Sequence, residues 1–288
     1  NHVTSEKTIG LYQNNNASQL AILTDGIYNN IDFTVNTLDN QTSLLNTLSG
    51  LNLTYFKRAP SQLFDKDARS LNQRVAKNVS NSNKDFVTIT YQVIAPPHSQ
   101  LHVSIPNISW SDDNNHSLSI TVNGMTKNQV TDNTFDFFDL GYFETESMVT
   151  IKLSFPGNKA ISFDNPSFYA LDTQNYQIAM DTINERDSKV TTSKNKVFVD
   201  YSSKTNASLF FTIPYDKGWT ATVNHKKVKI QRAQKGFMKV DVPSGKGKVV
   251  LTFIPYGLKT GSLISLLASI IFCCYAYFIR KTTIIQKS

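Results

Sequence analysis

The sequence predicts a mainly β protein with two β-sandwich units of jelly-roll or immunoglobulin type. A small α/β unit precedes them, and one transmembrane helix follows at the C-terminal end. Three observations predict this architecture. From residue 85 onward, apolar and polar residues alternate with the period of two that is typical of half-buried strands. Several strand patterns recur roughly a hundred residues later, and residues 261–279 carry no charge.

The first 84 residues form the predicted α/β unit and a linker. Residues 9–12 and 20–23 have short strand patterns, and residues 43–53 have the spacing of an amphipathic helix. Residues 58–84 are polar and basic, so we expect a loop or a surface helix that bridges to the next unit. One side of the predicted helix would carry its leucines: Leu44, Leu45, Leu48 and Leu51.

The first sandwich is expected over residues 85–170. Asn123-Gly124 follows its third strand pattern, and this dipeptide favours a two-residue hairpin whose residues need positive φ. The expected strands are 86–93, 101–105, 118–122, 135–140 and 148–155.

A short connecting helix is expected over residues 171–188, where a few apolar residues are spread through a polar stretch. The second sandwich then covers residues 189–257. Its expected strands are 197–201, 207–213, 219–223, 228–230, 237–242 and 248–254.

The two β regions read as an internal repeat. Ile105-Pro106 matches Ile213-Pro214, and Val122-Asn123 matches Val223-Asn224. Two further matches pair Trp110 with Trp219 and Phe155-Pro156 with Ile254-Pro255. Two sandwiches of similar topology explain these matches. The alternative is chance similarity between β sequences.

A transmembrane helix is expected over residues 258–280. The 19 uncharged residues 261–279 would span about 28 Å as a helix, close to the thickness of the hydrocarbon core. Arg280-Lys281 follows, and the positive-inside tendency places residues 281–288 in the cytoplasm and the residues before about 258 outside it. Tyr256 lies before the run and Tyr275 lies near its end, where aromatic residues favour the membrane interfaces. The alternative is a buried core helix.

Composition excludes several function classes. The net charge of +7 includes three positive residues beyond the apolar run, so residues 1–279 hold 26 basic and 22 acidic side chains, a balance of +4. No clustered basic motif for nucleic acid appears. The only cysteines, Cys273 and Cys274, lie inside the apolar run, so no disulfide or thiolate metal site is expected outside it. We predict no metal and no cofactor.

The most distinctive local motif is Ile-Pro-Tyr-Asp-Lys-Gly-Trp at residues 213–219, which should form a sharp turn into a strand. In one interpretation Tyr215, Asp216 and Trp219 contact a glycan, with the rings stacking on sugars and the carboxylate accepting hydroxyl hydrogen bonds. In the other, which we favour, Trp219 is a core residue of the sandwich.

No catalytic residue is predicted. An acid–base pair for glycoside cleavage needs two carboxyl groups across a cleft, and acidic side chains in loops are usually only solvated. The histidines lack the helical spacing of a zinc site, and no nucleophile elbow occurs. The acidic candidates for such a pair are Asp112, Asp113, Asp136, Asp139, Glu144 and Glu146.

The order of these pieces resembles the C-terminal region of the YfhO family of bacterial multi-pass membrane proteins. The resemblance rests mainly on residues 213–231 (IPYDKGWTATVNHKKVKIQ) and 246–267 (KGKVVLTFIPYGLKTGSLISLL). Residues 9–26 and 38–51 look like the start of the family's ectodomain. One departure is His225, where the family usually has glycine; histidine tolerates positive φ, so we expect the hairpin to survive.

The resemblance implies an extracytoplasmic accessory region of a membrane glycosyltransferase in a Gram-positive bacterium. Such an enzyme takes a sugar from a polyprenyl-phosphate carrier and attaches it to a cell-envelope polymer such as lipoteichoic acid. Its catalytic residues would lie in an upstream multi-helix membrane region, and a chain that begins at Asn1 would be cut from the longer protein. The alternative is a membrane-anchored carbohydrate-binding or adhesion ectodomain without enzymatic activity.

The expected partners are membrane lipid, the upstream membrane region and an anionic polymer. Lysines of the second sandwich would attract such a polymer, although a solvated β surface explains them as well. These lysines are Lys226, Lys227, Lys229, Lys235, Lys239, Lys246 and Lys248.

Overall fold

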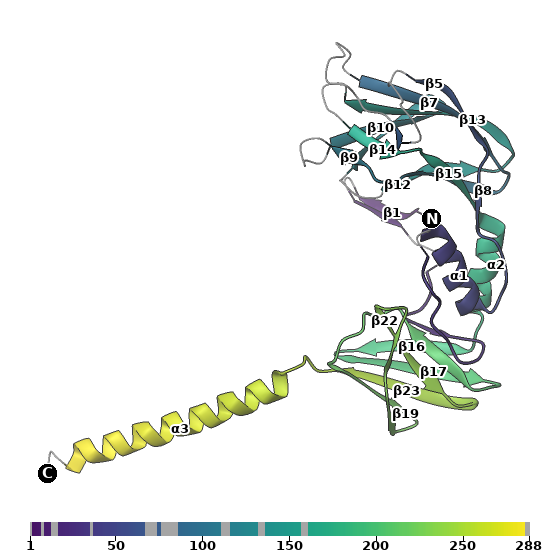
Figure 1. Cartoon of the computed structure of the whole chain (residues 1–288). Coiled ribbons are helices and arrows are strands. Elements are labelled where there is room, and N and C mark those ends of the chain that lie inside the picture. The colour runs from purple at the N-terminus through teal and green to yellow at the C-terminus, as the bar shows by residue number, and fades with distance from the viewer. Residues whose placement is uncertain are drawn as a thin grey trace. The chain divides into compact units, whose positions relative to one another are not determined.

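The computed structural model shows a mainly β chain that divides into two compact units (Figure 1). The first sandwich unit comprises residues 33–46 and 51–181, and the second comprises residues 1–32, 47–50 and 182–288. The structure describes residues 2–6, 9–12, 17–34, 37–66, 74–75, 86–110, 116–131, 136–156 and 161–285.

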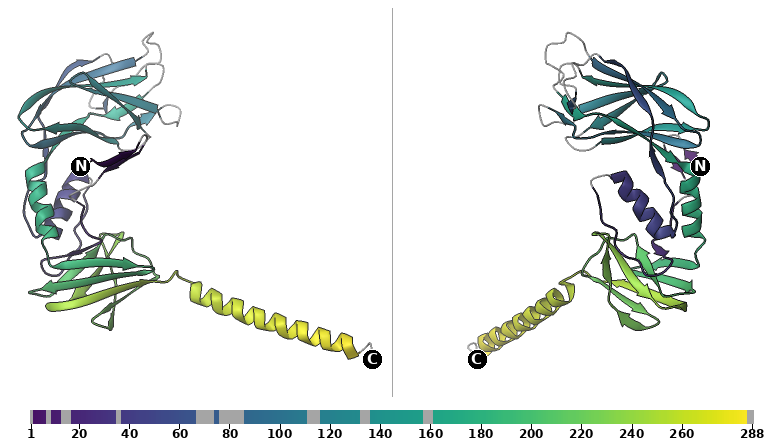
Figure 2. Two further views of the ribbon diagram at one scale, coloured as in Figure 1. Left: turned by 180° about the vertical axis from the view of Figure 1, so that it is seen from behind. Right: turned by 45° about the vertical axis from the view of Figure 1, so that its right-hand side comes forward.

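The first sandwich unit packs two antiparallel sheets face to face, as the two further views of the chain show (Figure 2). Its core is built from every second residue of the long strands, such as Leu101 and Val103 on one sheet and Val149 and Ile151 on the other. One sheet has the order β11 (Met125–Thr131), β10 (His116–Val122), β13 (Ser147–Pro156), β7 (Phe86–Ala95), β5 (Ser61–Lys66). The other has the order β12 (Asp136–Phe143), β8 (Ser99–Ile105), β15 (Ser167–Asp172), β4 (Phe56–Arg58). Three short strands form a small sheet: β6 (Arg74–Val75), β14 (Ile161–Asp164), β9 (Ser109–Trp110).

The second sandwich unit has the same construction around its own core, in which Val199, Leu209, Val240 and Leu251 are fully buried. One sheet has the order β16 (Ser188–Ser193), β17 (Lys196–Ser203), β23 (Gly245–Phe253), β19 (Trp219–Val223), β20 (Lys226–Val228). The other has the order β21 (Gln231–Ala233), β22 (Phe237–Val242), β18 (Ala207–Phe211), β3 (Ala21–Leu23). Strands β1 (His2–Glu6) and β2 (Ile9–Tyr12) pair only with each other among the described residues.

The predicted repeat is present in the strand order. The sequence β11-β10-β13-β7-β5 in the first sandwich corresponds to β20-β19-β23-β17-β16 in the second, and β12-β8-β15 corresponds to β22-β18-β3. The two sandwiches differ in the strand that pairs with β8 or with its equivalent, β18. In the first sandwich this strand is β15, which comes later in the chain than β8. In the second it is β3, which comes much earlier than β18 and pairs through Ile22 with Phe210. Residues 21–23, which the sequence grouped with the α/β unit, therefore lie in the sheet of the second sandwich.

Strand register corrects two of the residue matches. Val122 pairs with Ile151, and Val223 pairs with Val249, so counting back along β19 makes Trp219 equivalent to Leu118. The match of Trp110 with Trp219 is therefore wrong: Trp110 lies in β9, outside the repeated sheet. The same register makes Phe155 equivalent to Phe253 rather than to Ile254.

Both predicted helices exist with shifted ends. The helix expected over residues 43–53 is α1 (Thr37–Ser49), which ends where Gly50 takes a φ of 73°. Glycine is the usual residue at such a helix end because it adopts positive φ without strain. The connecting helix expected over residues 171–188 is α2 (Thr173–Asn184). The carboxylate of Asp172 accepts a hydrogen bond from the Asn175 amide (3.0 Å) and thereby caps its N-terminus.

The loop or surface helix expected over residues 58–84 is wrong for part of that stretch. Residues 61–66 form β5, an edge strand that pairs with β7. Side chains 61–64 are exposed, and the order Ser-Gln-Leu-Phe lacks the apolar alternation by which a half-buried strand is recognised. Residues 67–73 and 76–84 lie outside the described residues.

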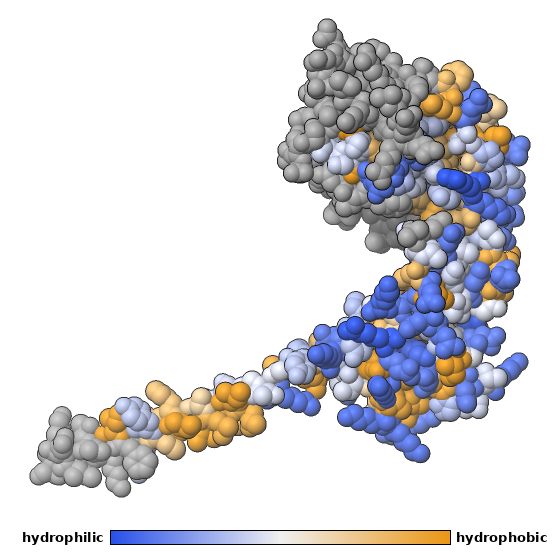
Figure 3. Space-filling view, viewed as in Figure 1, coloured by the Kyte–Doolittle hydropathy of each residue, from blue (hydrophilic) through white to orange (hydrophobic). Residues whose placement is uncertain are grey.

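The predicted apolar helix is α3 (Leu258–Ile285). Its segment Leu258–Tyr277 has a mean hydropathy of 1.7, is long enough to cross a membrane, and buries none of its residues in the protein. Figure 3 shows it as an apolar rod that leaves the second sandwich. An unburied apolar helix of about 30 Å is what a lipid bilayer accommodates, so the alternative of a buried core helix is wrong.

Candidate functional site

The motif at residues 213–219 forms the turn between β18 and β19, at the end of the second sandwich from which α3 leaves. We call this end the proximal end; it comprises residues 194–195, 212–218, 234–236 and 254–257. Backbone hydrogen bonds join these segments. The amide of Ile254 donates to the carbonyl of Gly218 (3.0 Å), and the amide of Tyr215 donates to the carbonyl of Gly236 (2.8 Å). The motif is therefore part of the junction between sandwich and helix.

Gly218 is needed at this junction because the chain approaches it too closely for a side chain. A Cβ atom built on Gly218 would lie 2.3 Å from the carbonyl oxygen of Ile254 and 2.8 Å from a ring carbon of Phe253. Atoms at such distances overlap, so the turn or the end of β23 would have to move apart. The residue thus couples the motif directly to the segment that enters α3.

The three candidate glycan residues have partners within this junction. The ring of Tyr215 lies under the guanidinium of Arg232, at 4.7 Å, and the ring of Trp219 packs against Phe253 at 4.9 Å. An Asp216 carboxylate oxygen accepts a hydrogen bond from the Gly218 amide (2.6 Å). Tyr215 and Trp219 are half-buried on the edge of the second core. The structure thus brings Tyr215, Asp216 and Trp219 together in one turn that stabilises the junction, and a glycan contact there stays a prediction.

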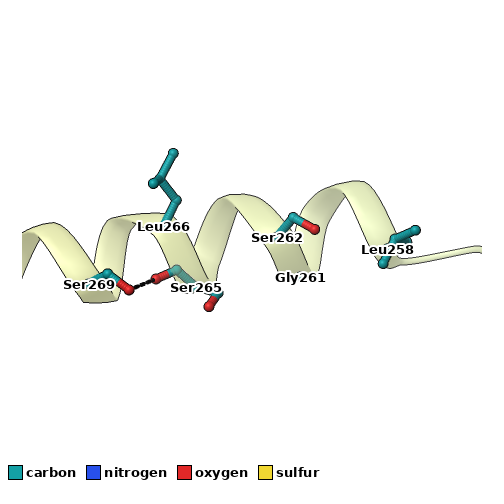
Figure 4. Close-up of a pocket in the computed structure, with 6 residues that line it drawn as sticks. All are labelled: Leu258, Gly261, Ser262, Ser265, Leu266 and Ser269. Carbon is teal, nitrogen blue, oxygen red and sulfur yellow. Dashed lines mark hydrogen bonds between the residues drawn. The ribbon is translucent and has the colours of Figure 1, made fainter.

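The first turns of α3 carry a shallow hollow lined by small side chains. Gly261, Ser262, Ser265 and Ser269 line it, and Figure 4 shows the Ser269 hydroxyl donating to the Ser265 carbonyl (2.8 Å). Leu258 and Leu266 complete the lining. Small residues at intervals of four are typical of faces where membrane helices pack closely.

A buried polar network on the second sandwich holds residues 24–32 against the outer face of its smaller sheet. The Tyr28 amide donates to the Ser208 hydroxyl (2.9 Å), and the Tyr28 hydroxyl donates to the side-chain oxygen of Gln234 (2.6 Å). Lys239, only 7% exposed, donates to the Tyr28 carbonyl (2.7 Å) and pairs with Asp241 (3.1 Å). Every one of these polar groups has a partner, as buried polar groups require.

Two pKa shifts follow from this network. Burial raises the pKa of the Tyr28 phenol to about 12. Burial also raises the pKa of the Asp241 carboxyl, but hydrogen bonds from Ser208, Lys239 and Gln231 and the Lys239 charge outweigh it, so that the pKa is lowered overall. The Asp241 carboxylate is therefore the stable form of this side chain at neutral pH.

Arg186 joins separate backbone segments through hydrogen bonds of its side chain. Its guanidinium donates to the carbonyls of Leu23 (2.6 Å), Leu48 (2.7 Å) and Ser49 (2.5 Å). Burial lowers the pKa of Arg186, and the Asp25 charge partly opposes that effect. The side chain ties the ends of β3 and α1 to the start of the second sandwich.

Several acidic candidates lie in the first sandwich without forming a site. Asp139 is exposed and accepts hydrogen bonds from Gln100 and from the Gly141 amide (2.9 Å). Glu144 is exposed, accepts from the Tyr142 hydroxyl (2.6 Å) and lies 3.3 Å from a ring nitrogen of His98. Asp112, Asp113 and the side chain of Asp136 fall outside the described residues. Over the described part of the chain, no group of three or more His, Cys, Asp or Glu could hold a metal ion.

The structure divides the lysine surface that the sequence treats as one. Lys239 is buried in the network, and Lys235 lies in the proximal turn between β21 and β22. The far end of the second sandwich, which we call the distal end, comprises residues 203–206, 224–227 and 243–246. The buried network around Tyr28 could not be predicted from the sequence, because Tyr28 and its partners lie about two hundred positions apart. The one local signal of the network in the sequence is the pair of charged residues, Lys239 and Asp241, inside an otherwise apolar strand pattern.

Comparisons with known proteins agree with the resemblance in the sequence. A family model described as "Bacterial membrane protein YfhO" matches residues 1–265. A relative from Bacillus subtilis (strain 168), named "Uncharacterized protein YfhO", is 25% identical over 141 residues. That match covers 46% of this chain and only 16% of the relative, so the chain corresponds to a small part of that protein.

Solved structures show only distant likeness. A Paenibacillus cycloisomaltooligosaccharide glucanotransferase is 8% identical, with 73% of this chain and 50% of that chain covered and a TM-score of 0.26. An allantoicase is 8% identical, with 69% and 87% covered and a TM-score of 0.29. A tandem CBM22 domain from Paenibacillus barcinonensis Xyn10C is 12% identical, with 70% and 86% covered and a TM-score of 0.23. Likenesses at this level carry no functional argument.

Proposed function

This chain belongs to the YfhO family of bacterial membrane proteins, and from that membership we propose that it forms the extracytoplasmic accessory region of a membrane glycosyltransferase. The enzyme would take a sugar from a polyprenyl-phosphate carrier and attach it to a cell-envelope polymer such as lipoteichoic acid. Its catalytic residues would lie in a multi-helix membrane region outside these 288 residues.

The observation that carries this proposal is the junction between the second sandwich and α3. Only four residues, 254–257, separate β23 from the helix, and the Ile254 amide is hydrogen-bonded to the motif turn. Such a short, bonded connection keeps the sandwich beside the bilayer, where a lipid-linked sugar donor is presented. Arg280-Lys281 after the apolar run favours a cytoplasmic C-terminus, with the sandwiches outside.

Lysines at the distal end support a role with an anionic acceptor. Lys204, Lys226, Lys227 and Lys246 are all exposed. Clustered like charges raise the local concentration of an oppositely charged polymer and speed its arrival. We therefore propose that the distal end guides the acceptor towards the membrane.

The first experiment deletes the gene in its host and measures glycosylation of the envelope polymers. We expect loss of one sugar modification, and complementation with the whole gene should restore it. Unchanged glycosylation of every polymer would contradict the transferase function and would favour the adhesion alternative.

The second experiment tests guidance in the complemented strain with the double variant Lys226→Glu and Lys227→Glu. Polymer glycosylation should fall several-fold, since the polyanion would meet a reversed charge. Lys127→Glu with Lys152→Glu, both exposed on the first sandwich, gives the same change in net charge and should have no effect. Equal activity in the two double variants would rule out guidance by the distal end while leaving the transferase function intact.

A further inference from the structure

Basic side chains surround the point where α3 leaves the second sandwich. Figure 3 shows hydrophilic side chains gathered at the base of the apolar helix. We name these residues the basic rim, and all of them are exposed. The rim consists of Lys194, Lys196, Lys217, Arg232, Lys235 and Lys259.

The turns that carry the rim are fixed to one another. The carbonyl and the side-chain amide of Asn195 both bond to Phe253, at 2.9 and 2.7 Å, which attaches the Lys194 turn to the end of β23. The Ile254–Gly218 bond attaches the Lys217 turn to the same point. Arg232 lies over Tyr215 in that turn. The folded proximal end therefore holds these rim residues at fixed positions.

Connectivity keeps the rim close to a bilayer that α3 spans. The five peptide links from Phe253 to Leu258 reach about 17 Å at full extension. The real connection is shorter, because the Leu258 amide bonds to the Pro255 carbonyl (3.1 Å) and Gly257 turns the chain with a φ of 86°. Tyr256, which is 81% exposed, lies in this connection, and the ammonium of Lys217 in the neighbouring turn is 5.7 Å from its ring centroid.

Three lysines of the rim, Lys194, Lys196 and Lys217, have little charge compensation among the described residues. Asp216 is the acidic residue of the proximal turns, so a single carboxylate there faces the basic side chains of the rim. Within the described part of the chain, Lys194, Lys196 and Lys217 have no carboxylate oxygen within 4.0 Å. Exposed lysines at an anionic membrane surface gain favourable energy from the negative lipid headgroups within about one Debye length, roughly 8–10 Å.

We propose that the proximal end of the second sandwich binds the headgroups of anionic phospholipids through this basic rim. Headgroup binding seats the sandwich on the bilayer surface and restricts its rotation about the short connection to α3. This inference does not depend on the proposed transferase function, because it uses only the rim, the connection and the apolar helix.

The test uses the whole chain in nanodiscs of phosphatidylcholine alone and of phosphatidylcholine mixed equally with phosphatidylglycerol. Amide hydrogen exchange is followed in peptides that cover residues 212–218, and in peptides that cover the distal hairpin, residues 223–227, as an internal reference. We expect slower exchange of the proximal peptides in the anionic nanodiscs only, with no change at the distal hairpin. The difference should disappear at about 0.5 M salt, where screening is nearly complete.

Matched charge reversals identify the surface responsible. The triple variant Lys194→Glu, Lys196→Glu and Lys217→Glu should lose the lipid-dependent protection. The triple variant Lys204→Glu, Lys226→Glu and Lys227→Glu makes the same change in net charge at the distal end and should keep it. Cooperative unfolding of both variants confirms that they fold, and the comparison of lipids in the unsubstituted chain stands without them.

Three outcomes would overturn the proposal. The first is equal protection in neutral and anionic nanodiscs, and the second is lipid-dependent protection that survives in the proximal triple variant. The third uses soluble poly(glycerol phosphate) added to neutral nanodiscs. If the polymer reproduces the full protection, the rim is a site for a polyanion and not for lipid headgroups.

Discussion

Asn123 and Asn224 occupy equivalent positions in the two sandwiches and make the same hydrogen bonds. Each is the first residue of a two-residue hairpin turn, with φ values of 46° and 48°. The side-chain oxygen of Asn123 accepts from the Thr150 amide (3.0 Å), and that of Asn224 accepts from the Lys248 amide (2.8 Å). The backbone N–H of each asparagine also donates to the backbone carbonyl of the same partner, at 3.1 and 2.9 Å. A shared side-chain arrangement of this kind supports an internal duplication more strongly than the shared strand order does.

The second residue of these hairpins distinguishes the two sandwiches. His225 holds a φ of 67°, where the first sandwich has Gly124 at 89°. Since left-handed backbone is strained for residues with a Cβ atom, we expect His225→Gly to stabilise the second sandwich by about 0.5–1 kcal/mol. Urea unfolding would be followed by Trp219 emission in a Trp110→Phe background. The reverse change, Gly124→His, should destabilise the first sandwich by a similar amount, followed by Trp110 emission in a Trp219→Phe background. Unchanged midpoints for both changes would refute the strain.

The contact between Gly218 and Ile254 predicts a large effect from one methyl group. Gly218→Ala should destabilise the second sandwich by about 1–3 kcal/mol, since the new Cβ atom overlaps the Ile254 carbonyl. Gly236→Ala is the matched control at the same end, because a Cβ atom there meets nothing within 4 Å and its φ is not positive. The measurement is the urea midpoint of the two variants. Equal midpoints for the two variants would mean that the backbone near Gly218 moves to accommodate the added methyl group without loss of stability.

The sequence predicts those parts of the fold that are encoded locally. Alternation over residues such as 118–122 and 148–155 identified strands, Asn123-Gly124 identified a hairpin, and an uncharged stretch identified α3. The placement of β3 could not be read in this way, because its partner Phe210 lies nearly two hundred residues away and no local pattern records the pairing. The edge strand β5 could not be recognised because its two apolar residues, Leu63 and Phe64, are adjacent and do not alternate with polar ones.

In the candidate site, too, the features encoded locally could be predicted and those that depend on distant residues could not. The residues 213–219 were recognisable as a turn from proline and glycine, but their role at the junction depends on Phe253 and Ile254, which only the folded chain brings near. The basic rim could not be recognised in the sequence for the same reason, since its lysines come from three separate turns, from the start of β17 and from the first turn of α3. Sequence spacing groups Lys235 with Lys226, whereas the fold places them at opposite ends of the sandwich.

The three carbonyls bound by Arg186 predict that lysine cannot replace it. A planar guanidinium donates to several acceptors at fixed angles, whereas a single ammonium on a flexible stem reaches fewer of them. We expect Arg186→Lys to cost about 1–3 kcal/mol in the free energy of unfolding, because at least one buried carbonyl of Leu23, Leu48 or Ser49 loses its donor. Arg232→Lys, at an exposed arginine that packs over Tyr215, is the control and should cost much less. Similar losses in the free energy of unfolding from the two changes would show that the three hydrogen bonds of Arg186 do not require a guanidinium.

Asp241 predicts the direction in which the stability of the second sandwich changes with pH. Its pKa is lower in the folded chain than its ordinary value of 3.8. The folded state therefore binds its proton less readily than the unfolded state. Its contribution to stability is fully present above the unfolded pKa and is lost as the pH falls through the folded pKa. The free energy of unfolding should thus decline from about pH 5 downward.

The variant Asp241→Asn separates this contribution from those of the other carboxyl groups. At pH 7 it should cost about 2 kcal/mol, since Lys239 keeps its bond to the Tyr28 carbonyl but loses its charged partner. The cost should shrink as the pH falls below the ordinary pKa of 3.8, because the unfolded state then binds a proton that the folded carboxylate binds less readily. Urea unfolding at a series of pH values, followed by Trp219 emission in the Trp110→Phe background, gives both curves. Asp200→Asn, which removes an exposed pair with Lys248, should leave the slope nearly unchanged, whereas parallel curves for Asp241→Asn and the unsubstituted chain would show that the network does not depend on this charge.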